Sequence, residues 1–86
     1  MQVKVKFYGS LRKLTRAKEI NVEVPEGSSV MELITYLSDI YGEEFEREVI
    51  DKGKIKRLVR IALNEEDIED LSEKLEEGDE VSFTSR

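Results

Sequence analysis

Several short segments of this 86-residue chain alternate between apolar and polar residues, and this pattern constrains the fold more than any other feature. The segments are QVKVKFY at 2–8, EINVEVP at 19–25, IKRLVRIAL at 55–63 and EVSFTS at 80–85. Alternation of this kind is typical of a β-strand with one buried and one exposed face. The chain therefore predicts a sheet that needs a cover over one face only.

One amphipathic segment, between Ser29 and Gly42, predicts that cover. Ser29 is a suitable helix N-cap, and Glu32 stands where the second residue of a capping box is expected. Gly42 stands where the C-terminus of a helix often takes a residue of positive φ. Apolar residues recur at helical spacing and form one stripe, which consists of Val30, Leu33, Ile34, Leu37, Ile40 and Tyr41.

The remaining segments predict connections. We expect residues 9–19 to form a loop anchored by leucines, residues 43–50 to form a short helical turn, and residues 51–54 to form a turn. Residues 72–79 predict a one-turn helical piece before the last strand.

The order of the elements predicts one α+β domain over residues 1–86. The first and last strands are expected to be neighbours at the centre, because the first strand must pair with more than the second. The predicted fold is a ubiquitin-like β-grasp, a mixed sheet of four to five strands with one main helix across one face.

Composition excludes several kinds of site. The chain has no cysteine and no histidine, which removes thiolate metal sites and the commonest general base near neutral pH. We therefore expect no enzyme, no metal and no cofactor. The net charge of −6 disfavours nucleic acid as a partner. No apolar run approaches the ~20 residues of a membrane span, so we expect a cytoplasmic protein. The 40% of charged residues is typical of thermophile proteins.

Charge is unevenly distributed along the chain. Residues 1–60 carry 12 basic and 10 acidic side chains, whereas residues 61–86 carry 2 basic and 10 acidic ones. The acidic end is either a solvated rim or a surface that docks on a basic partner. The basic run KGKIKRLVR at 52–60 is interpreted as edge protection, because Lys54 and Lys56 discourage pairing at a strand edge.

Longer stretches carry a resemblance to a known family. FYGSLRKL at 7–14, GSSVMELI at 27–34, RIALNEEDI at 60–68 and LEEGDEVSF at 75–83 resemble, in this order, the ubiquitin-like sulfur carriers. This family includes the small subunit of molybdopterin synthase and the thiamine sulfur carrier. The resemblance implies that an activating enzyme adenylates a C-terminal Gly-Gly carboxylate with ATP and Mg²⁺. Sulfur transfer then gives a thiocarboxylate, which the tail delivers inside the large synthase subunit.

The chain departs from this pattern in its tail and at one turn. It has no Gly-Gly up to Arg86, so we expect a degenerate paralogue that forms no thiocarboxylate. Family members often have Asn-Gly where this chain has Asn64-Glu65, and Glu disfavours the positive φ of a mirror-image turn, so we expect another turn type. Two alternatives stay open. One is a true sulfur carrier whose tail lies beyond Arg86, and the other is a binding or regulatory module unrelated to sulfur transfer.

The resemblance also implies a partner-binding face, with a synthase large subunit or an activating enzyme as the protein partner. This face is apolar in the family, but of the matching residues Tyr8, Asp67 and Thr84 only Tyr8 keeps an apolar body. An interface core normally excludes charge, so Asp67 argues against the usual docking mode. With the outward residues of the neighbouring strands added, the expected partner-binding residues are Tyr8, Arg60, Ala62, Asp67, Ser82 and Thr84.

Overall fold

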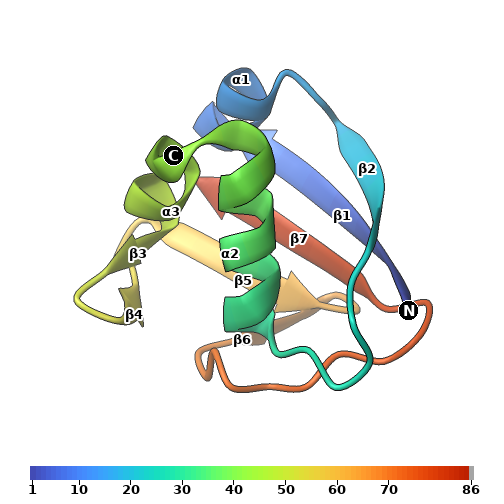
Figure 1. Cartoon of the computed structure of the whole chain (residues 1–86). Coiled ribbons are helices and arrows are strands. Elements are labelled where there is room, and N and C mark those ends of the chain that lie inside the picture. The colour runs from blue at the N-terminus through green and yellow to red at the C-terminus, as the bar shows by residue number, and fades with distance from the viewer. Residues whose placement is uncertain (86) are drawn as a thin grey trace.

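The computed structural model describes residues 1–85 and contains a five-stranded mixed sheet in the order β2-β1-β7-β5-β6 (Figure 1). Strand β7 is parallel to β1 and antiparallel to β5, so the first and last strands are the central neighbours, as predicted. The remaining pairs, β1–β2 and β5–β6, are antiparallel. The predicted α+β, β-grasp fold is therefore confirmed. The strands are β1 (Gln2–Gly9), β2 (Glu19–Glu23), β5 (Val59–Leu63), β6 (Glu66–Ile68) and β7 (Glu80–Ser85).

Helix α2 (Val30–Tyr41) crosses one face of this sheet (Figure 1). The predicted capping box is present: the Ser29 hydroxyl accepts the backbone N–H of Glu32 at 3.1 Å, and the Glu32 carboxylate accepts that of Ser29 at 2.9 Å. Gly42 follows the helix with a φ of 98°. The predicted stripe is buried at Val30, Leu33, Ile34 and Leu37 and partly buried at Tyr41, whereas Ile40 is 50% exposed. At 3.6 residues per turn, Ile40 lies at the edge of the stripe and turns away from the sheet.

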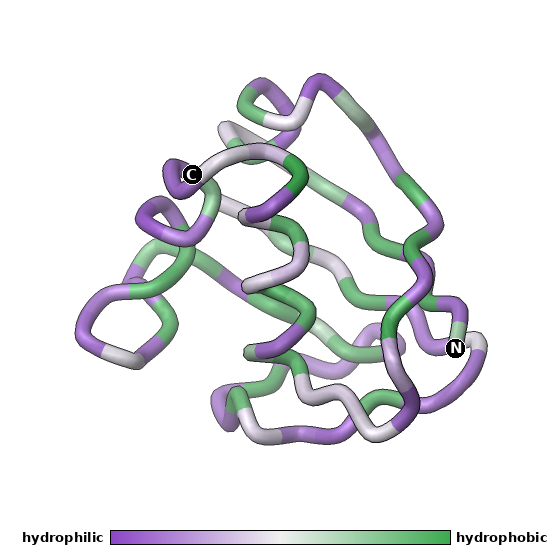
Figure 2. The backbone as a smooth tube through the Cα atoms, viewed as in Figure 1, coloured by the Kyte–Doolittle hydropathy of each residue, from purple (hydrophilic) through white to green (hydrophobic). Residues whose placement is uncertain are grey.

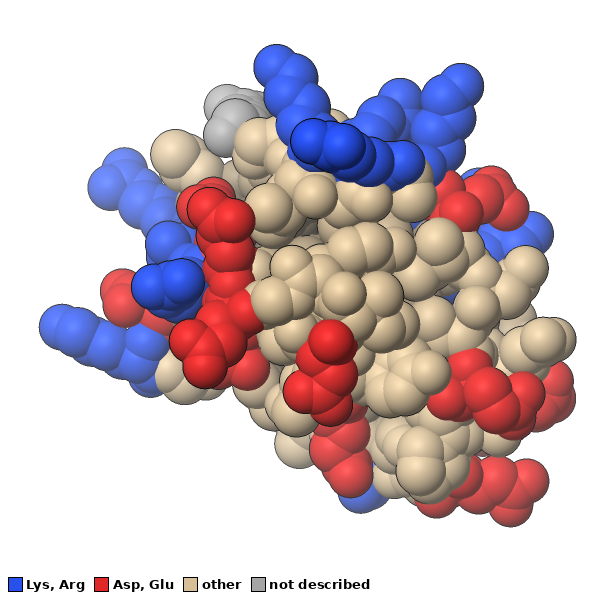
Figure 3. All heavy atoms as spheres, turned by 45° about the horizontal axis from the view of Figure 1, so that its top comes forward, with Lys and Arg blue, Asp and Glu red and all other residues tan. Residues whose placement is uncertain are grey.

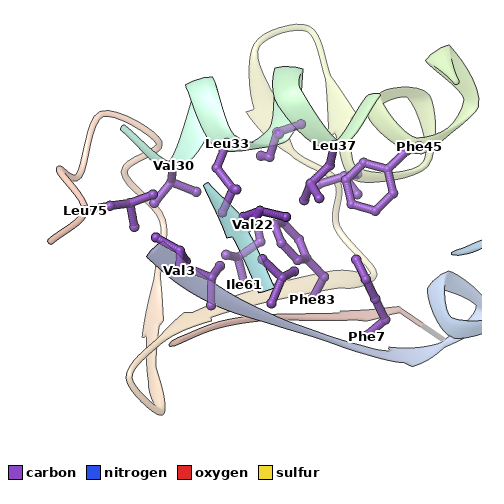
Figure 4. Packing of buried hydrophobic residues seen from close by; sticks show 14 of the residues in the cluster. Val3, Phe7, Val22, Val30, Leu33, Leu37, Phe45, Ile61, Leu75 and Phe83 are labelled. Carbon is purple, nitrogen blue, oxygen red and sulfur yellow. The ribbon is translucent and has the colours of Figure 1, made fainter. Parts of the chain in front are cut away.

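The core lies between α2 and the inward face of the sheet (Figure 4). In Figure 2 hydrophobic and hydrophilic residues alternate along the strands, as the sequence predicts. Phe7, Phe45 and Phe83 are fully buried, and the ring centroids of Phe45 and Phe83 are 5.5 Å apart in an edge-on arrangement. Such aromatic pairs contribute about 0.5–1.5 kcal/mol beyond the area that they bury.

Two segments predicted as turns contain more regular structure. Helix α1 (Ser10–Thr15) replaces the predicted loop, and it places Leu11 in the core. Helix α3 (Glu43–Val49) is longer than the single turn expected and buries Phe45 and Val49. Both helices are short, so a core contact rather than a sequence repeat decides their formation.

The predicted third strand over residues 55–63 is also shorter than expected. Strands β3 (Ile50–Asp51) and β4 (Lys54–Ile55) form a separate two-stranded hairpin. Strand β5 then begins only at Val59. The predicted turn at 51–54 is therefore the tip of this hairpin.

Residues 72–79 contain no helix, so that prediction is wrong. The backbone of this segment and its neighbour instead completes the start of α2: Val30 N–H donates to the Glu73 carbonyl and Met31 N–H to the Leu71 carbonyl, each at 3.0 Å. The N–H of Leu75 donates to the Ser28 carbonyl at 2.8 Å, and the Leu75 side chain is buried. The first N–H groups of a helix lack partners within it, so this long-range pairing outweighs a local helical turn.

The turn between β5 and β6 also corrects a prediction. Asn64 and Glu65 both have positive φ, 50° and 72°, which is the mirror-image turn that Glu was expected to prevent. Asn64 is held on both sides: its side-chain NH₂ donates to the Asp79 carboxylate at 3.0 Å, and its side-chain oxygen accepts the Glu80 N–H at 2.9 Å. These bonds to distant residues offset the strain at Glu65.

No helix among residues 1–85 is long and apolar enough to cross a membrane.

Candidate functional site: the outer face of the sheet

The expected partner-binding residues lie together on the face of the sheet opposite α2. Side chains alternate between the two faces of a strand, so the residues between the inward core positions point outward. One row runs across β1, β7 and β5: Tyr8 is paired with Thr84, and Thr84 with Arg60. We call the whole set the outer-face patch, which consists of Tyr8, Arg60, Ala62, Asp67, Ser82 and Thr84.

A second row of the patch lies one step along the strands. Ser82 on β7 is paired with Ala62 on β5, and Ala62 with Asp67 on β6. Ala62 is 9% exposed, so its small side chain forms a floor between polar neighbours. The structure therefore brings together all the residues that the sequence selected, from four different strands.

An ion pair crosses the edge of the patch. Arg60 Nε lies 3.2 Å from Asp67 Oδ2, and the two side chains are 69% and 62% exposed. The charge of Asp67 is thus balanced within the patch. Exposed pairs of this kind contribute only about 0–1 kcal/mol, so this pair adds little to the stability of the sheet.

A second ion pair, missed by the sequence analysis, lies beside the patch. Lys6 is paired in register with Ser82, and its Nζ lies 3.5 Å from the Glu80 carboxylate. The Glu80 carboxylate raises the pKa of Lys6, so this lysine stays charged. The alternation of β1 placed Lys6 and Tyr8 on one face, but the register with β7 could not be predicted.

Arg12 was also missed, because residues 9–19 were predicted to form a loop. Helix α1 brings the Arg12 guanidinium carbon to 5.4 Å from the ring centroid of Tyr8. Arg12 Nε donates to the Phe7 carbonyl at 3.1 Å, which fixes the cation in that position. Tyr8 is 39% exposed, so its ring is held by the cation while part of it faces solvent.

The end of β7 is fixed beside the patch. Gly9 has a φ of 67° and is paired with Ser85, and a Cβ built on Gly9 would lie 1.8 Å from the Ser85 carbonyl oxygen. The hydroxyls of Ser10 and Ser85 are also in contact, and Ser85 is buried. Only glycine fits at position 9 without moving the end of β7.

The chemistry of the patch is that of a binding surface. Its polar groups are hydroxyls and one exposed ion pair, and the ring of Tyr8 adds an apolar surface. Among residues 1–85, no three acidic side chains gather in the way that a metal site requires.

The model of the ThiS family matches residues 5–84 of the chain. A putative molybdopterin converting factor, subunit 1, from Pyrococcus furiosus is 32% identical, with a TM-score of 0.83 and coverage of 99% of this chain and 97% of that chain. CysO from Mycobacterium tuberculosis is 28% identical, with a TM-score of 0.79 and coverage of 96% and 97%.

A solved complex of subunits 1 and 2 of the molybdopterin-converting factor from Helicobacter pylori matches at 23% identity, with a TM-score of 0.68 and coverage of 100% of this chain and 95% of that chain. This likeness shows the fold alone. No curated protein matches the chain. Because the family model covers nearly the whole chain, the protein belongs to the ThiS family of ubiquitin-like sulfur carriers.

Proposed function

We propose that this protein works by binding a protein partner through the outer-face patch. The observation that carries the proposal is the register of β1, β7, β5 and β6, which gathers the patch beside the end of β7. In the family, the resemblance places both the partner face and the reactive tail at this end. The Helicobacter pylori neighbour is described as a protein–protein complex, which supports a protein as the partner.

The composition of the patch suits such a contact. An aromatic residue and an arginine are the side chains most enriched at protein interfaces, and Tyr8 and Arg60 supply them. Ala62, at the floor, leaves room for a side chain of the partner. By resemblance to the molybdenum-cofactor members, the partner is a synthase large subunit or an activating enzyme.

The finer proposal is that the protein is a degenerate paralogue that forms no thiocarboxylate. Its support is the exposed Arg60–Asp67 ion pair, which stands on a face that the resemblance implies is apolar. A partner built for an apolar face would have to bury or displace these charges, which disfavours binding in the usual mode.

Isothermal titration calorimetry tests the partner. The two titrants are the large-subunit homologue and the activating-enzyme homologue encoded in the same genome. We expect one of them to bind. Ala62→Arg, which fills the floor of the patch, should weaken binding at least about tenfold, equivalent to about 1.4 kcal/mol. The control is Lys18→Glu, because Lys18 is exposed and lies outside the patch. This variant should bind as the wild type does. Equal binding by wild type and Ala62→Arg would exclude the patch.

Mass spectrometry tests the finer proposal separately. The protein isolated from its own host is incubated with the activating enzyme, ATP, Mg²⁺ and a sulfur donor. We expect an unchanged mass. An acyl-adenylate or an exchange of one oxygen for sulfur at the C-terminus would overturn the degenerate assignment, while the docking proposal would stand.

A further inference from the structure

A second surface lies next to the patch, on the segment that leads into β5. Lys52, Lys54, Lys56 and Arg57 come from the β3–β4 hairpin and the residues directly after it. We call these cations the basic ridge. In Figure 3 basic side chains project at the left of the view, on the side of this hairpin.

The cations of the ridge differ from other cations of the sheet in their ion pairing. Lys4, Lys6 and Arg60 each have a carboxylate within 4 Å. Within residues 1–85, no ion pair at that distance involves a residue of the basic ridge. This charge is therefore available to a ligand.

Two hollows adjoin the ridge. Lys54, Lys56 and Arg57 line both of them, with volumes of about 700 and 630 Å³. Acidic residues line the same hollows, Glu48 and Asp51 the first and Asp67 and Glu69 the second. Basic residues outnumber acidic ones in the lining of both hollows, so each hollow favours an anionic group.

An apolar side chain stands at the end of the ridge. Leu58 is 63% exposed, more than any other large hydrophobic residue of the described chain. It lines a smaller hollow together with Arg57, Arg60 and Thr84, so the ridge is continuous with the outer-face patch. Protection of a strand edge accounts for the lysines but not for an exposed leucine among them.

We propose that the basic ridge and Leu58 together bind an acidic, extended segment of a protein. The ridge supplies unpaired positive charge, the hollows supply room, and Leu58 supplies an apolar contact that a purely anionic ligand would leave unused. Nucleic acid fits less well, because a phosphate backbone would leave the exposed Leu58 without an apolar contact. This inference does not depend on sulfur transfer or on the partner of the outer-face patch.

NMR titration of the ¹⁵N-labelled protein tests the inference. The probe is a short synthetic peptide of glutamates with one central leucine, and its controls are the same peptide with glutamine for glutamate and an oligo-dT. We expect the acidic peptide to shift the amides of residues 52–60 and Thr84. The shifts should weaken as salt is raised, because screening reduces the attraction between exposed charges.

Variants assign the effect to side chains. Replacing Lys54, Lys56 and Arg57 by Gln should weaken peptide binding about tenfold, because each exposed ion pair contributes a few-fold. The matched control replaces Lys13, Arg16 and Lys18 by Gln, which removes the same charge from α1 and the residues after it, outside the linings of the two hollows, and should change binding little. Leu58→Ser should weaken binding several-fold, whereas Ile40→Ser, at a half-exposed residue of α2, should not. Urea unfolding confirms that each variant is folded.

Three outcomes would overturn the inference. The first is equal weakening by the ridge variant and its charge-matched control. The second is tighter binding of oligo-dT than of the peptide at the same amides. The third is that the same shifts appear on raising the protein concentration alone, which would identify a second copy of the chain as the occupant.

Discussion

Replacement of Gly9 by alanine tests how the end of β7 is fixed. Gly9 is the last residue of β1 and the N-cap of α1, and it is paired with Ser85 on β7. Its φ of 67° is unfavourable for any residue with a Cβ, and that Cβ would lie 1.8 Å from the Ser85 carbonyl oxygen. The substitution therefore has two separate costs, one from the backbone and one from the collision.

The structure gives the size of each cost. A left-handed φ costs a non-glycine residue about 1–2 kcal/mol. Relief of the collision moves Ser85 by roughly 1.5 Å towards ordinary contact, which disrupts its pairing with Gly9 and its contact with Ser10. These lost contacts add about 1–3 kcal/mol. We expect a total loss of about 3–4 kcal/mol, and a Tm lowered by at least about 12 °C for a domain of this size.

Urea unfolding followed by circular dichroism measures both costs. Gly27→Ala is the matched control, because Gly27 has a φ of 82° but no atom within 4 Å of an added Cβ. It should lose only the backbone cost of about 1–2 kcal/mol. If Gly9→Ala and Gly27→Ala destabilise by the same amount within about 0.5 kcal/mol, the collision with Ser85 does not constrain position 9.

Two further substitutions follow from the structure. Glu65→Gly should raise the free energy of unfolding by about 0.5–1 kcal/mol, because it relieves the left-handed strain at a φ of 72°. The control Glu66→Gly, in β6, should lower the free energy of unfolding. A Glu65→Gly variant that is less stable than the wild type would contradict the turn geometry. Hydrogen bonds from Ser29 lower the pKa of Glu32 from its ordinary value of 4.5. A lowered pKa in the folded state stabilises the protein above the unfolded value, and this contribution is lost as the pH falls through the folded pKa. Glu32→Gln should therefore have a lower free energy of unfolding than the wild type at pH 7, and this difference should shrink in acid. A difference that does not depend on pH would refute the role of the Glu32 charge.

Local signals in the sequence predicted the parts of the fold that depend on neighbouring residues. The alternation at 2–8 and 80–85 gave the strands and their inward sides, and the pair Ser29 and Glu32 gave the start of α2. The turn at Asn64 could not be predicted in this way. Its conformation depends on hydrogen bonds to Asp79 and Glu80, which are distant in the sequence and therefore do not enter a local turn propensity.

The candidate site likewise depends partly on local sequence signals and partly on long-range contacts. Alternation identified Tyr8, Ser82 and Thr84 as outward residues, but only the register of the strands makes them neighbours. The contact of Arg12 with Tyr8 could not be predicted, because α1 is a single short helix whose sequence has no periodic pattern. The basic run at 52–60 was visible in the sequence, yet its position beside Thr84 depends on the register of β5 with β7.

The central claim is that the outer face of the sheet, opposite α2, binds a protein partner. Hydrogen–deuterium exchange of the protein, alone and with the partner found by calorimetry, tests it most directly. Binding at this face predicts slower exchange on complex formation at the amides around Tyr8, Ala62 and Thr84, with no change along the exposed side of α2. Protection along α2 together with unchanged exchange around those residues would contradict it.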